Sequence, residues 1–223
     1  MFRDRMDGGQ QLARELLRYQ KFHPLVVALP RGGVPVGYEV ARALETDLDV
    51  IVVRKLGAPG NPEFAIGAIA PGVIEVNRLI VETYGIPERY IDQVIARERA
   101  EMERRERRYR SGRAPSDAAG RTVLLIDDGL ATGATASAAI ASIRKQRPER
   151  IVFGAPACAC ESADDLAHKA DEVVCVLRPR DFGAVSLWYH DFVPTTDDDV
   201  TECLDRAAKA RASVGSDPGG GEP

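Results

Sequence analysis

The chain has 223 residues, of which 44% are hydrophobic and 29% are charged. These values are ordinary for a globular protein, so they exclude a fibrous repeat and wholesale disorder, and the length allows one large domain or one domain with a small appendage. The formal net charge of -4 argues against a general nucleic-acid binder, and we expect no nucleic-acid partner.

The first part of the chain predicts a strand-helix-strand unit. Leucines at helical spacing predict an amphipathic helix over residues 7–21. The apolar run 25–29, which ends at a proline, predicts a buried strand, residues 34–44 return to helical spacing, and residues 49–53 form a second apolar run. Such an order is typical of a parallel sheet with helices on its faces.

The middle of the chain predicts a loop with a hairpin and then a long helix. Glycines and prolines interrupt the apolar pieces of residues 54–77, whereas residues 88–110 contain neither, and Pro87 suits the first position of a helix. The second half of this helix is crowded with arginine and glutamate. We expect a solvated helix with i,i+4 ion pairs, and the alternative is a lid that attracts anions.

Further strand-helix units follow a polar stretch. The strands are predicted at residues 122–126, 150–155 and 172–176, and the helices at residues 136–146, 162–170 and 197–212. We expect residues 213–223, which are rich in glycine and proline, to be a disordered tail after a single domain of residues 1–212.

The four cysteines indicate neither a disulfide framework nor a zinc site. Cys158 and Cys160 form a single CxC, and Cys175 and Cys203 stand alone, whereas zinc sites usually come as paired clusters. We expect all four to be buried free thiols. No apolar stretch could span a membrane, and the polar start MFRDR differs from a signal peptide, so we expect a cytoplasmic protein.

Two acids, Asp127 and Asp128, follow the strand predicted at residues 122–126. Ligands of open parallel sheets bind beyond the carboxyl ends of the strands, which is where these acids stand. An isolated pair of this kind would more often be a turn and a helix cap. The next residues decide between the two interpretations.

A short loop of small residues leads from the acids into the next predicted helix. Gly129 and Gly133 let the backbone approach a ligand, Thr132 and Thr135 add hydroxyls, and the start of the helix offers free N–H groups to a phosphate. A phosphate cradle beside two carboxylates suits a sugar phosphate, whose hydroxyls would bind the acids.

The run VLLIDDGLATGAT resembles the motif that binds 5-phosphoribosyl-1-pyrophosphate (PRPP) in type I phosphoribosyltransferases. Over residues 1–208, from FRDR to DFVPTTDDDV, the chain resembles a subfamily whose acceptor is unassigned. The resemblance implies an open, mostly parallel α/β sheet with helices on both faces, a C-terminal hood at residues 178–196, and an inserted lid within residues 56–113.

The same resemblance implies a role for two further segments. Pro30 to Gly33 matches the pyrophosphate loop of the family, with Arg31 as the expected pyrophosphate contact and a peptide bond that can be cis without proline. Arg54 and Lys55, which we place at the end of the second strand, would neutralise the leaving group. The lid would exclude water from the reacting centre.

The implied reaction transfers the phosphoribosyl group from PRPP to a nitrogen acceptor such as a nucleobase, with release of pyrophosphate. Magnesium would accompany PRPP, held by Asp127 and Asp128 directly or through water. The alternatives are a regulatory module that binds PRPP or a nucleotide with little turnover, and a hydrolase. A homo-oligomer is compatible with each of these functions. The predicted catalytic residues are Arg31, Lys55, Asp127 and Asp128, and the predicted substrate-binding residues are Arg31, Gly32, Gly33, Arg54, Lys55, Asp127, Asp128, Gly129, Ala131, Thr132, Gly133, Ala134, Thr135, Phe182 and Trp188, with Tyr189 as a further aromatic of the hood.

Overall fold

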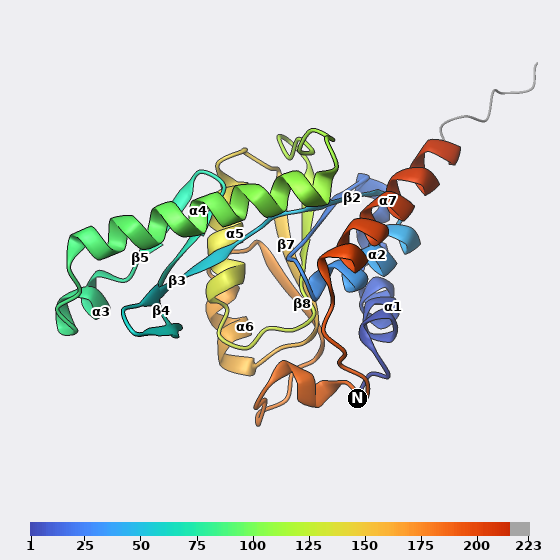
Figure 1. Cartoon of the computed structure of the whole chain (residues 1–223). Helices are drawn as coiled ribbons and strands as arrows, with labels where there is room; N and C mark the ends of the chain where they lie inside the picture. Colours follow the sequence, from blue (N-terminus) through green and yellow to red (C-terminus); the bar gives the residue numbers. More distant parts are fainter. Residues whose placement is uncertain (215–223) are drawn as a thin grey trace, which may run out of the picture.

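A computed structural model describes residues 1–214 of the chain and has a five-stranded parallel sheet at its centre (Figure 1). The strand order is β2-β1-β6-β7-β8. The strands are β1 (Leu25–Ala28), β2 (Asp47–Val50), β6 (Thr122–Ile126), β7 (Arg150–Ala157) and β8 (Glu172–Leu177). The predicted α/β class and mostly parallel sheet are therefore confirmed.

Helices cover both faces of this sheet. On one face α1 (Arg5–Leu16) and α2 (Gly33–Ala43) pack against Leu124 and Ile126 of β6, and on the other α5 (Ala134–Arg144) and α6 (Cys160–Leu166) pack near Val123 and Leu125. Because alternate residues of β6 enter opposite cores, the strand is apolar throughout. The helix predicted over residues 7–21 divides into α1 and a 3-10 helix, η1 (Leu17–Phe22).

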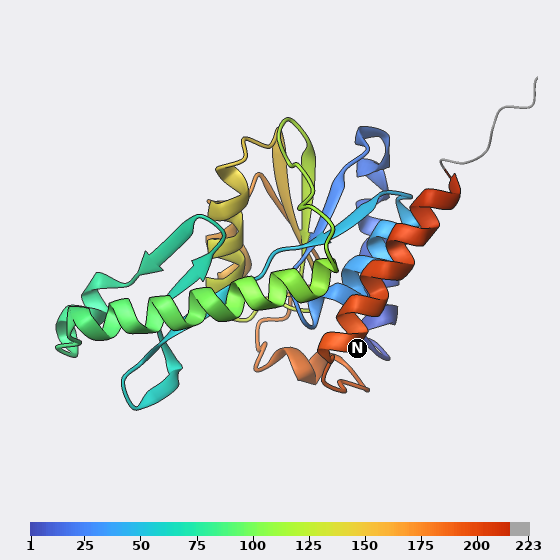
Figure 2. The same ribbon diagram turned by 45° about the horizontal axis from the view of Figure 1, so that its top comes forward.

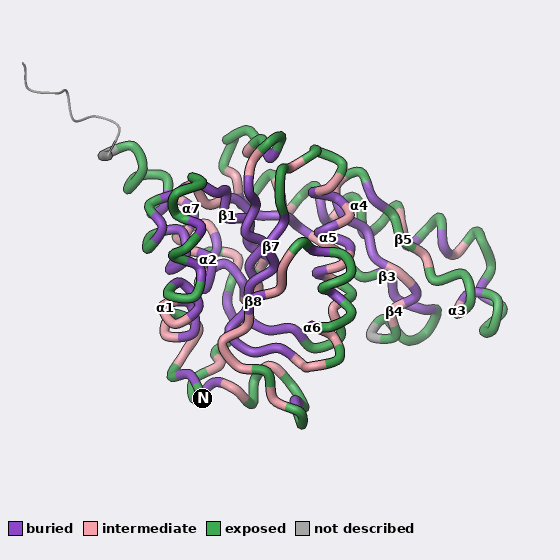
Figure 3. Tube along the Cα trace, turned by 180° about the vertical axis from the view of Figure 1, so that it is seen from behind, coloured by how far each residue is buried: buried purple, intermediate pink, exposed green. Residues whose placement is uncertain are grey.

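Residues 54–110 form an arm beside the central sheet (Figures 1 and 2). It contains an antiparallel sheet of β3 (Arg54–Ala58), β4 (Asn61–Ala70) and β5 (Val73–Val76), then α3 (Arg78–Thr83) and α4 (Glu88–Arg110). The long helix after Pro87 is confirmed, and the predicted hairpin is a three-stranded sheet. Seen from behind, the outer turns of the arm are exposed, whereas the central strands are buried (Figure 3).

The second predicted strand needs a correction. It was expected over residues 49–53 with Arg54 and Lys55 at its end, but β2 ends at Val50 and both residues lie in β3. The backbone N–H of Ile51 still bonds to the carbonyl of Ala28 at 3.1 Å, after which the chain leaves the parallel sheet and Arg54 pairs with Ile69. The unbroken apolar run hid this change of sheet.

The arginine-rich end of α4 makes the predicted ion pairs. Glu101 accepts from Arg104 and Arg105, each at 2.7 Å, which lowers the pKa of Glu101 to about 2. Arg107 pairs with Glu103, and Arg110 with Glu106 and Asp49. These contacts favour the interpretation of α4 as a solvated structural helix over that of an anion-attracting lid.

The C-terminal helix α7 (Asp197–Val214) meets the end of α4, as Figure 2 shows. At this joint Asp197 accepts a hydrogen bond from the Tyr109 hydroxyl at 2.7 Å and one from Arg108 at 3.1 Å. Burial, reinforced by the Asp197 carboxylate, raises the pKa of Tyr109 to about 12. Residues 213 and 214 of the predicted tail belong to α7, and the rest of that tail lies outside the described residues.

The expectation of four free thiols is wrong for two of them. A disulfide joins Cys158, just after β7, to Cys175 of β8, with the Cα atoms 6.1 Å apart. β7 and β8 are parallel neighbours in which Cys175 lies opposite Ala155, and Cys158, 17 positions before Cys175 in the sequence, reaches it from just beyond the end of β7. Cys160 and Cys203 remain free. No helix within residues 1–214 has both the length and the apolar character needed to cross a bilayer.

The Cys158–Cys175 disulfide determines how many thiols of the chain can react. Two thiols per chain should react in denaturant without reductant, and all four after reduction, because two of the four cysteines are joined. Reduction should also lower the free energy of unfolding by about 3 kcal/mol, since the unfolded chain loses a cross-link. Thiol titration and denaturant unfolding provide the measurements, and Cys203→Ser, which leaves the bridge intact, should lower the oxidised count by one. A count of four without reductant would contradict the bridge.

Candidate functional site

The loops after β1 and β6 meet at the point where the strand order diverges, because β1 is followed by β2 on one side of the sheet and β6 by β7 on the other. These strands are parallel neighbours, with Ala28 opposite Ile126, and α2 and α5 leave them toward opposite faces. Such a switch point is the usual ligand crevice of an open α/β sheet. The structure therefore brings the Pro30–Gly33 loop and the acid pair together.

The two glycines of the first loop lie against the acids. A Cβ atom on Gly32 would stand 1.9 Å from Oδ2 of Asp128, and one on Gly33 would stand 2.7 Å from the carbonyl oxygen of Ile126 and 3.1 Å from Oδ1 of Asp127. No side chain fits at either position without moving the backbone or the carboxylates. Both glycines are thus required by the close approach of the two loops.

The acid pair lies in an environment that opposes its charge. Burial raises the pKa of Asp127 well above its ordinary value, and the adjacent charge of Asp128 adds to the effect. Burial also raises the pKa of Asp128, against the lowering effect of Arg5. The backbone N–H of Asp128 donates to Oδ1 of Asp127 at 2.8 Å. A ligand that brings hydroxyl donors or a cation would stabilise the ionised pair.

Two residues that bind Asp128 were not recognised from the sequence. Arg5, at the start of α1, donates from Nε to Oδ2 of Asp128 at 2.7 Å. Tyr189 donates its hydroxyl to the carbonyl oxygen of Asp128 at 2.5 Å. Arg5 lies 123 positions from its partner, and its only sequence signal was its place in the opening FRDR. Tyr189 was considered only as an aromatic for stacking.

The loop of residues 129–133, which we call the phosphate loop after the role that the resemblance implies, is hydrogen-bonded to its neighbours at its start and leads into helix α5. Leu130 donates its N–H to Ala157 at 2.9 Å and accepts from Ala159 at 2.8 Å, which fixes the loop on the end of β7. A Cβ on Gly129 would lie 2.5 Å from Val185 of the hood segment. Gly133, with φ +73°, stands at the N-cap of α5. The first turn of this helix therefore has N–H groups available to an anion.

A cavity of about 410 Å³ separates this loop from the arm. Thr132, Gly133 and Ala134 line one side of it, and Gly67 and Glu75 of the small sheet line another. Ala131 and Thr132 are exposed, and Thr135 is half-buried. The arm is thus next to the phosphate loop, although nothing within residues 56–113 was predicted to face it in particular.

Arg31 lies in the first loop and is half-exposed. The Pro30–Arg31 peptide bond is cis, as the resemblance implied. The guanidinium of Arg31 lies 3.9 Å from a carboxylate oxygen of Asp197, with 46% of the side chain exposed. Since such an exposed pair is weak, Arg31 can exchange this partner for a ligand anion.

Arg54 and Lys55 are placed differently from each other. Arg54 donates from Nη2 to the buried carboxylate of Glu98 on α4 at 2.7 Å, so its charge is used within the arm. Lys55 is exposed on β3. Neither residue is at the end of a central strand, so their predicted contact with a leaving group would require the arm to supply it.

The aromatic residues of the hood segment, residues 178–196, pack mainly on one another. Phe182 is 7% exposed and stacks on Trp188 with ring centroids 6.1 Å apart, and the indole N–H of Trp188 donates to the carbonyl of Phe182 at 3.0 Å. Tyr189 is also buried. Trp188 is half-buried and sits at the end of η2 (Val185–Trp188), so it has more exposed ring surface than its two neighbours.

A divalent cation fits this site only when a phosphorylated ligand binds with it. Within residues 1–214 no three acidic, histidine or cysteine side chains are grouped to hold a metal ion. Asp127 and Asp128 supply hard carboxylate oxygens, which suit magnesium, an ion that keeps several waters and shares phosphate oxygens with its substrate. The donor set therefore fits an ion that a phosphorylated ligand brings with it.

The open parallel sheet thus carries an acid pair and a glycine-containing loop at its switch point, and residues 3–186 match the family model of the phosphoribosyl transferase domain. The chain belongs to this family. It is 41% identical over 224 residues to "Putative phosphoribosyl transferase Rv0571c" of Mycobacterium tuberculosis, a match that covers 100% of this chain and 51% of that protein. The chain thus spans about half the length of this curated relative.

Among solved structures, the crystal structure of TT1426 from Thermus thermophilus is similar along nearly the whole chain. The TM-score is 0.78 at 41% sequence identity, and the match covers 92% of this chain and 97% of the other. A crystal structure therefore shares this fold over 92% of this chain.

Proposed function

We propose that the protein transfers the 5-phosphoribosyl group of PRPP to a nitrogen acceptor of the nucleobase type and releases pyrophosphate. The observation that carries the proposal is the contact between the glycines of the Pro30–Gly33 loop and the acid pair, with the phosphate loop directly after it. One site then offers carboxylates to the ribose hydroxyls and helix N–H groups to the 5-phosphate. It also offers pyrophosphate the partly exposed Arg31, whose ion pair with Asp197 is weak.

Each group has a task in the proposed reaction. Asp127 and Asp128 accept hydrogen bonds from the ribose hydroxyls and hold the sugar while positive charge develops at its anomeric carbon. Arg31 gives up Asp197 and binds the leaving pyrophosphate. Bound magnesium would neutralise pyrophosphate charge, and Asp127 and Asp128 would hold it directly or through water.

The arm and the hood segment complete the proposed site. The arm faces the phosphate loop across the 410 Å³ cavity, and its movement toward that loop would exclude water, which competes as an acceptor. Lys55, exposed on the arm, is the cation we expect such a movement to bring to the pyrophosphate. Trp188 is the hood aromatic we expect to stack on the acceptor.

A regulatory module that binds PRPP without turnover is the competing function. A version that binds nucleic acid would need a free basic face, and the arginines near the end of α4 are engaged by glutamates of the same helix and by aspartates of β2 and α7. This pairing favours the enzyme over a nucleic-acid sensor.

The test is calorimetric titration with PRPP and magnesium, followed by a pyrophosphate-release screen against purine and pyrimidine bases. Binding together with release in the presence of one base would support transfer and identify the acceptor. Binding with no release from any base would favour the regulatory module. No binding would mean that the loops are kept for the fold, and the proposal would be wrong.

A further inference from the structure

The first residues of the chain are built into the hood segment. Phe2 is 1% exposed and packs on Tyr189 with ring centroids 5.5 Å apart. Its N–H donates to the carbonyl of Trp188 at 2.8 Å, and its carbonyl accepts from His190 at 2.9 Å. The N–H of Asp191 then donates to the carbonyl of Arg3 at 2.8 Å. Residues 2–5, which we call the N-terminal strap, therefore run beside the hood as α1 begins.

Arg5 ends this strap and joins the hood to the acid pair. Its Nε donates to Oδ2 of Asp128 at 2.7 Å, and its Nη1 donates to the carbonyl of Val193 at 2.8 Å. Its guanidinium carbon lies 3.7 Å from the ring centroid of Phe192. The side chain is only 11% exposed and that of Asp128 only 15%. The guanidinium is thus fixed on two edges and one face.

Arg5 binds Asp128 through one oxygen, Oδ2. A Cβ on Gly32 would collide with this same Oδ2, and the side chain of Asp127 interacts with that of Asp128. An arginine that holds one oxygen in a fixed geometry fixes the orientation of the whole carboxylate, because the group is planar.

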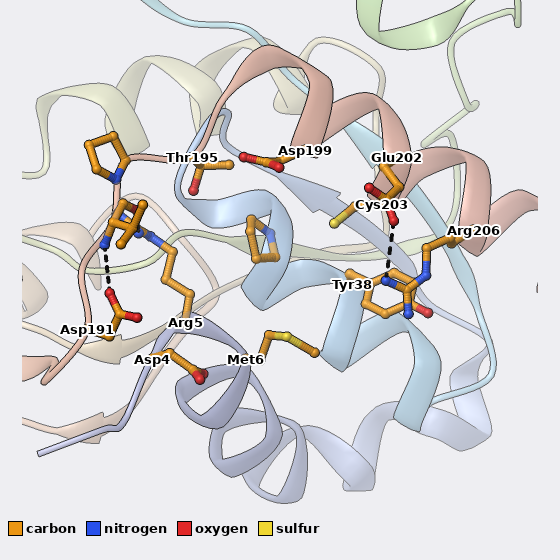
Figure 4. A pocket seen from close by; sticks show the side chains of 13 residues that line it. Asp4, Arg5, Met6, Tyr38, Asp191, Thr195, Asp199, Glu202, Cys203 and Arg206 are labelled. Atoms are coloured by element: carbon orange, nitrogen blue, oxygen red, sulfur yellow. Dashed lines mark hydrogen bonds and ion pairs between the residues drawn. The ribbon is translucent and has the colours of Figure 1, made fainter.

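The other side of Arg5 faces a cavity of about 340 Å³ between α1, α2 and α7 (Figure 4). Met6, Tyr38 and Cys203 line this cavity, and Arg206 stands on its far side, with its guanidinium carbon 4.8 Å from the Tyr38 ring centroid. Arg5 and Arg206 therefore border the same cavity, but only Arg5 reaches the acid pair. Arg206 is a matched control for the loss of one arginine.

We propose that Arg5 is a positioning residue of the phosphoribosyl site, which holds Oδ2 of Asp128 and so fixes the orientation of this carboxylate toward a ribose hydroxyl. The proposal rests on the proposed function, since it assumes that PRPP binds at the acid pair. Arg5 acts on the ribose through Asp128, and Arg31 belongs to the pyrophosphate. Loss of Arg5 should therefore weaken ligands that contain ribose and spare inorganic pyrophosphate.

The experiment titrates the unaltered protein, Arg5→Gln, Arg5→Lys and Arg206→Gln with PRPP and magnesium and, separately, with inorganic pyrophosphate without a divalent cation, so that the second titration involves no metal at the acid pair. Arg5→Gln should weaken PRPP about tenfold or more, because a charge-assisted hydrogen bond that orients the acid is lost. The PRPP affinity of Arg5→Lys should lie between those of Arg5→Gln and the unaltered protein, because a single ammonium cannot contact both Asp128 and Val193 as the guanidinium does. Pyrophosphate affinity should stay within about twofold, and Arg206→Gln should match the unaltered protein.

A double-mutant cycle separates positioning from a general structural effect. In an Asp128→Asn background, Arg5→Gln should change PRPP affinity by much less than it does alone, because the side chain through which Arg5 acts has changed. If Arg5→Gln does not fold, Arg5→Lys enters the same cycle under the same criteria.

Three results would overturn the inference. They are unchanged PRPP affinity in folded Arg5 variants, equal losses for PRPP and pyrophosphate, and an undiminished loss in the Asp128→Asn background. If the unaltered protein binds pyrophosphate but not PRPP, or neither, the proposed function itself fails and this inference fails with it.

Discussion

Asp127→Asn/Asp128→Asn should greatly weaken PRPP binding and PRPP-dependent release of pyrophosphate. Each carboxylate is expected to accept a charge-assisted hydrogen bond from the ribose, and such bonds contribute about 1.5–3 kcal/mol each, so affinity should fall roughly 10²- to 10⁴-fold. Calorimetric titration with PRPP and magnesium measures the loss, and thermal unfolding confirms that the variant is folded.

The control removes two carboxylates elsewhere. Asp92→Asn/Asp164→Asn changes the net charge equally, at exposed positions of α4 and α6, and should leave PRPP affinity unchanged. Equal losses in the two double variants would indicate a general electrostatic effect. Full affinity in the folded Asp127→Asn/Asp128→Asn variant would exclude the acid pair as the ribose site.

Gly32→Ala should have the second largest effect. The new Cβ would lie 1.9 Å from Oδ2 and 2.6 Å from Cγ of Asp128, so either the loop or the carboxylate must shift by about 1 Å or more. A displacement of that size at a reacting centre costs roughly 100-fold in rate. Steady-state kinetics with the acceptor identified by the release screen, or PRPP affinity if the protein only binds, measures the effect.

Gly120→Ala provides the contrasting case. Gly120 has φ +66° and no atom within 4 Å of an added Cβ, so alanine there meets conformational strain but no neighbour. It should lower the free energy of unfolding by about 1–2 kcal/mol and leave PRPP affinity unchanged. Should Gly32→Ala instead lose only stability, the close approach of the two loops would be a packing feature without a role in the site.

The central sheet and the acid pair could be predicted from the sequence because their signals are local. The strand at residues 122–126 coincides with β6. Its five residues are all buried, since both faces of the sheet are covered, and an uninterrupted apolar run is the expected pattern for that situation. Asp127 and Asp128 then follow by chain position alone.

The three-stranded sheet of the arm and the disulfide could not be predicted because they depend on long-range pairing. Glycine and proline interrupt β3 and β4, and Gly67 is required there only because the carbonyl oxygen of Glu75 on β5 lies 2.1 Å from where its Cβ would be. The register places Cys175 opposite Ala155, so the disulfide depends on how the chain continues to Cys158 beyond the end of β7. Neither arrangement leaves a periodic pattern in the sequence.

Arg5 was missed for a related reason. In the sequence it is one of several charged residues at the start of an amphipathic helix, for which solvent exposure is the ordinary expectation. Its burial follows from the strap that holds Phe2 in the hood, a contact between segments about 190 positions apart in the sequence. Long-range ion pairs of this kind cannot be recognised by spacing.

Asp197 links the Pro30–Gly33 loop thermodynamically to the arm. One carboxylate serves Arg31 from the loop and Arg108 and Tyr109 from α4, so these groups share a single acceptor. An anion that takes Arg31 away removes one positive neighbour of Asp197 and leaves more of its charge for α4. Linkage is reciprocal, so a tighter joint between α4 and α7 must favour anion binding by the same free energy, about 1 kcal/mol or less for an exposed pair.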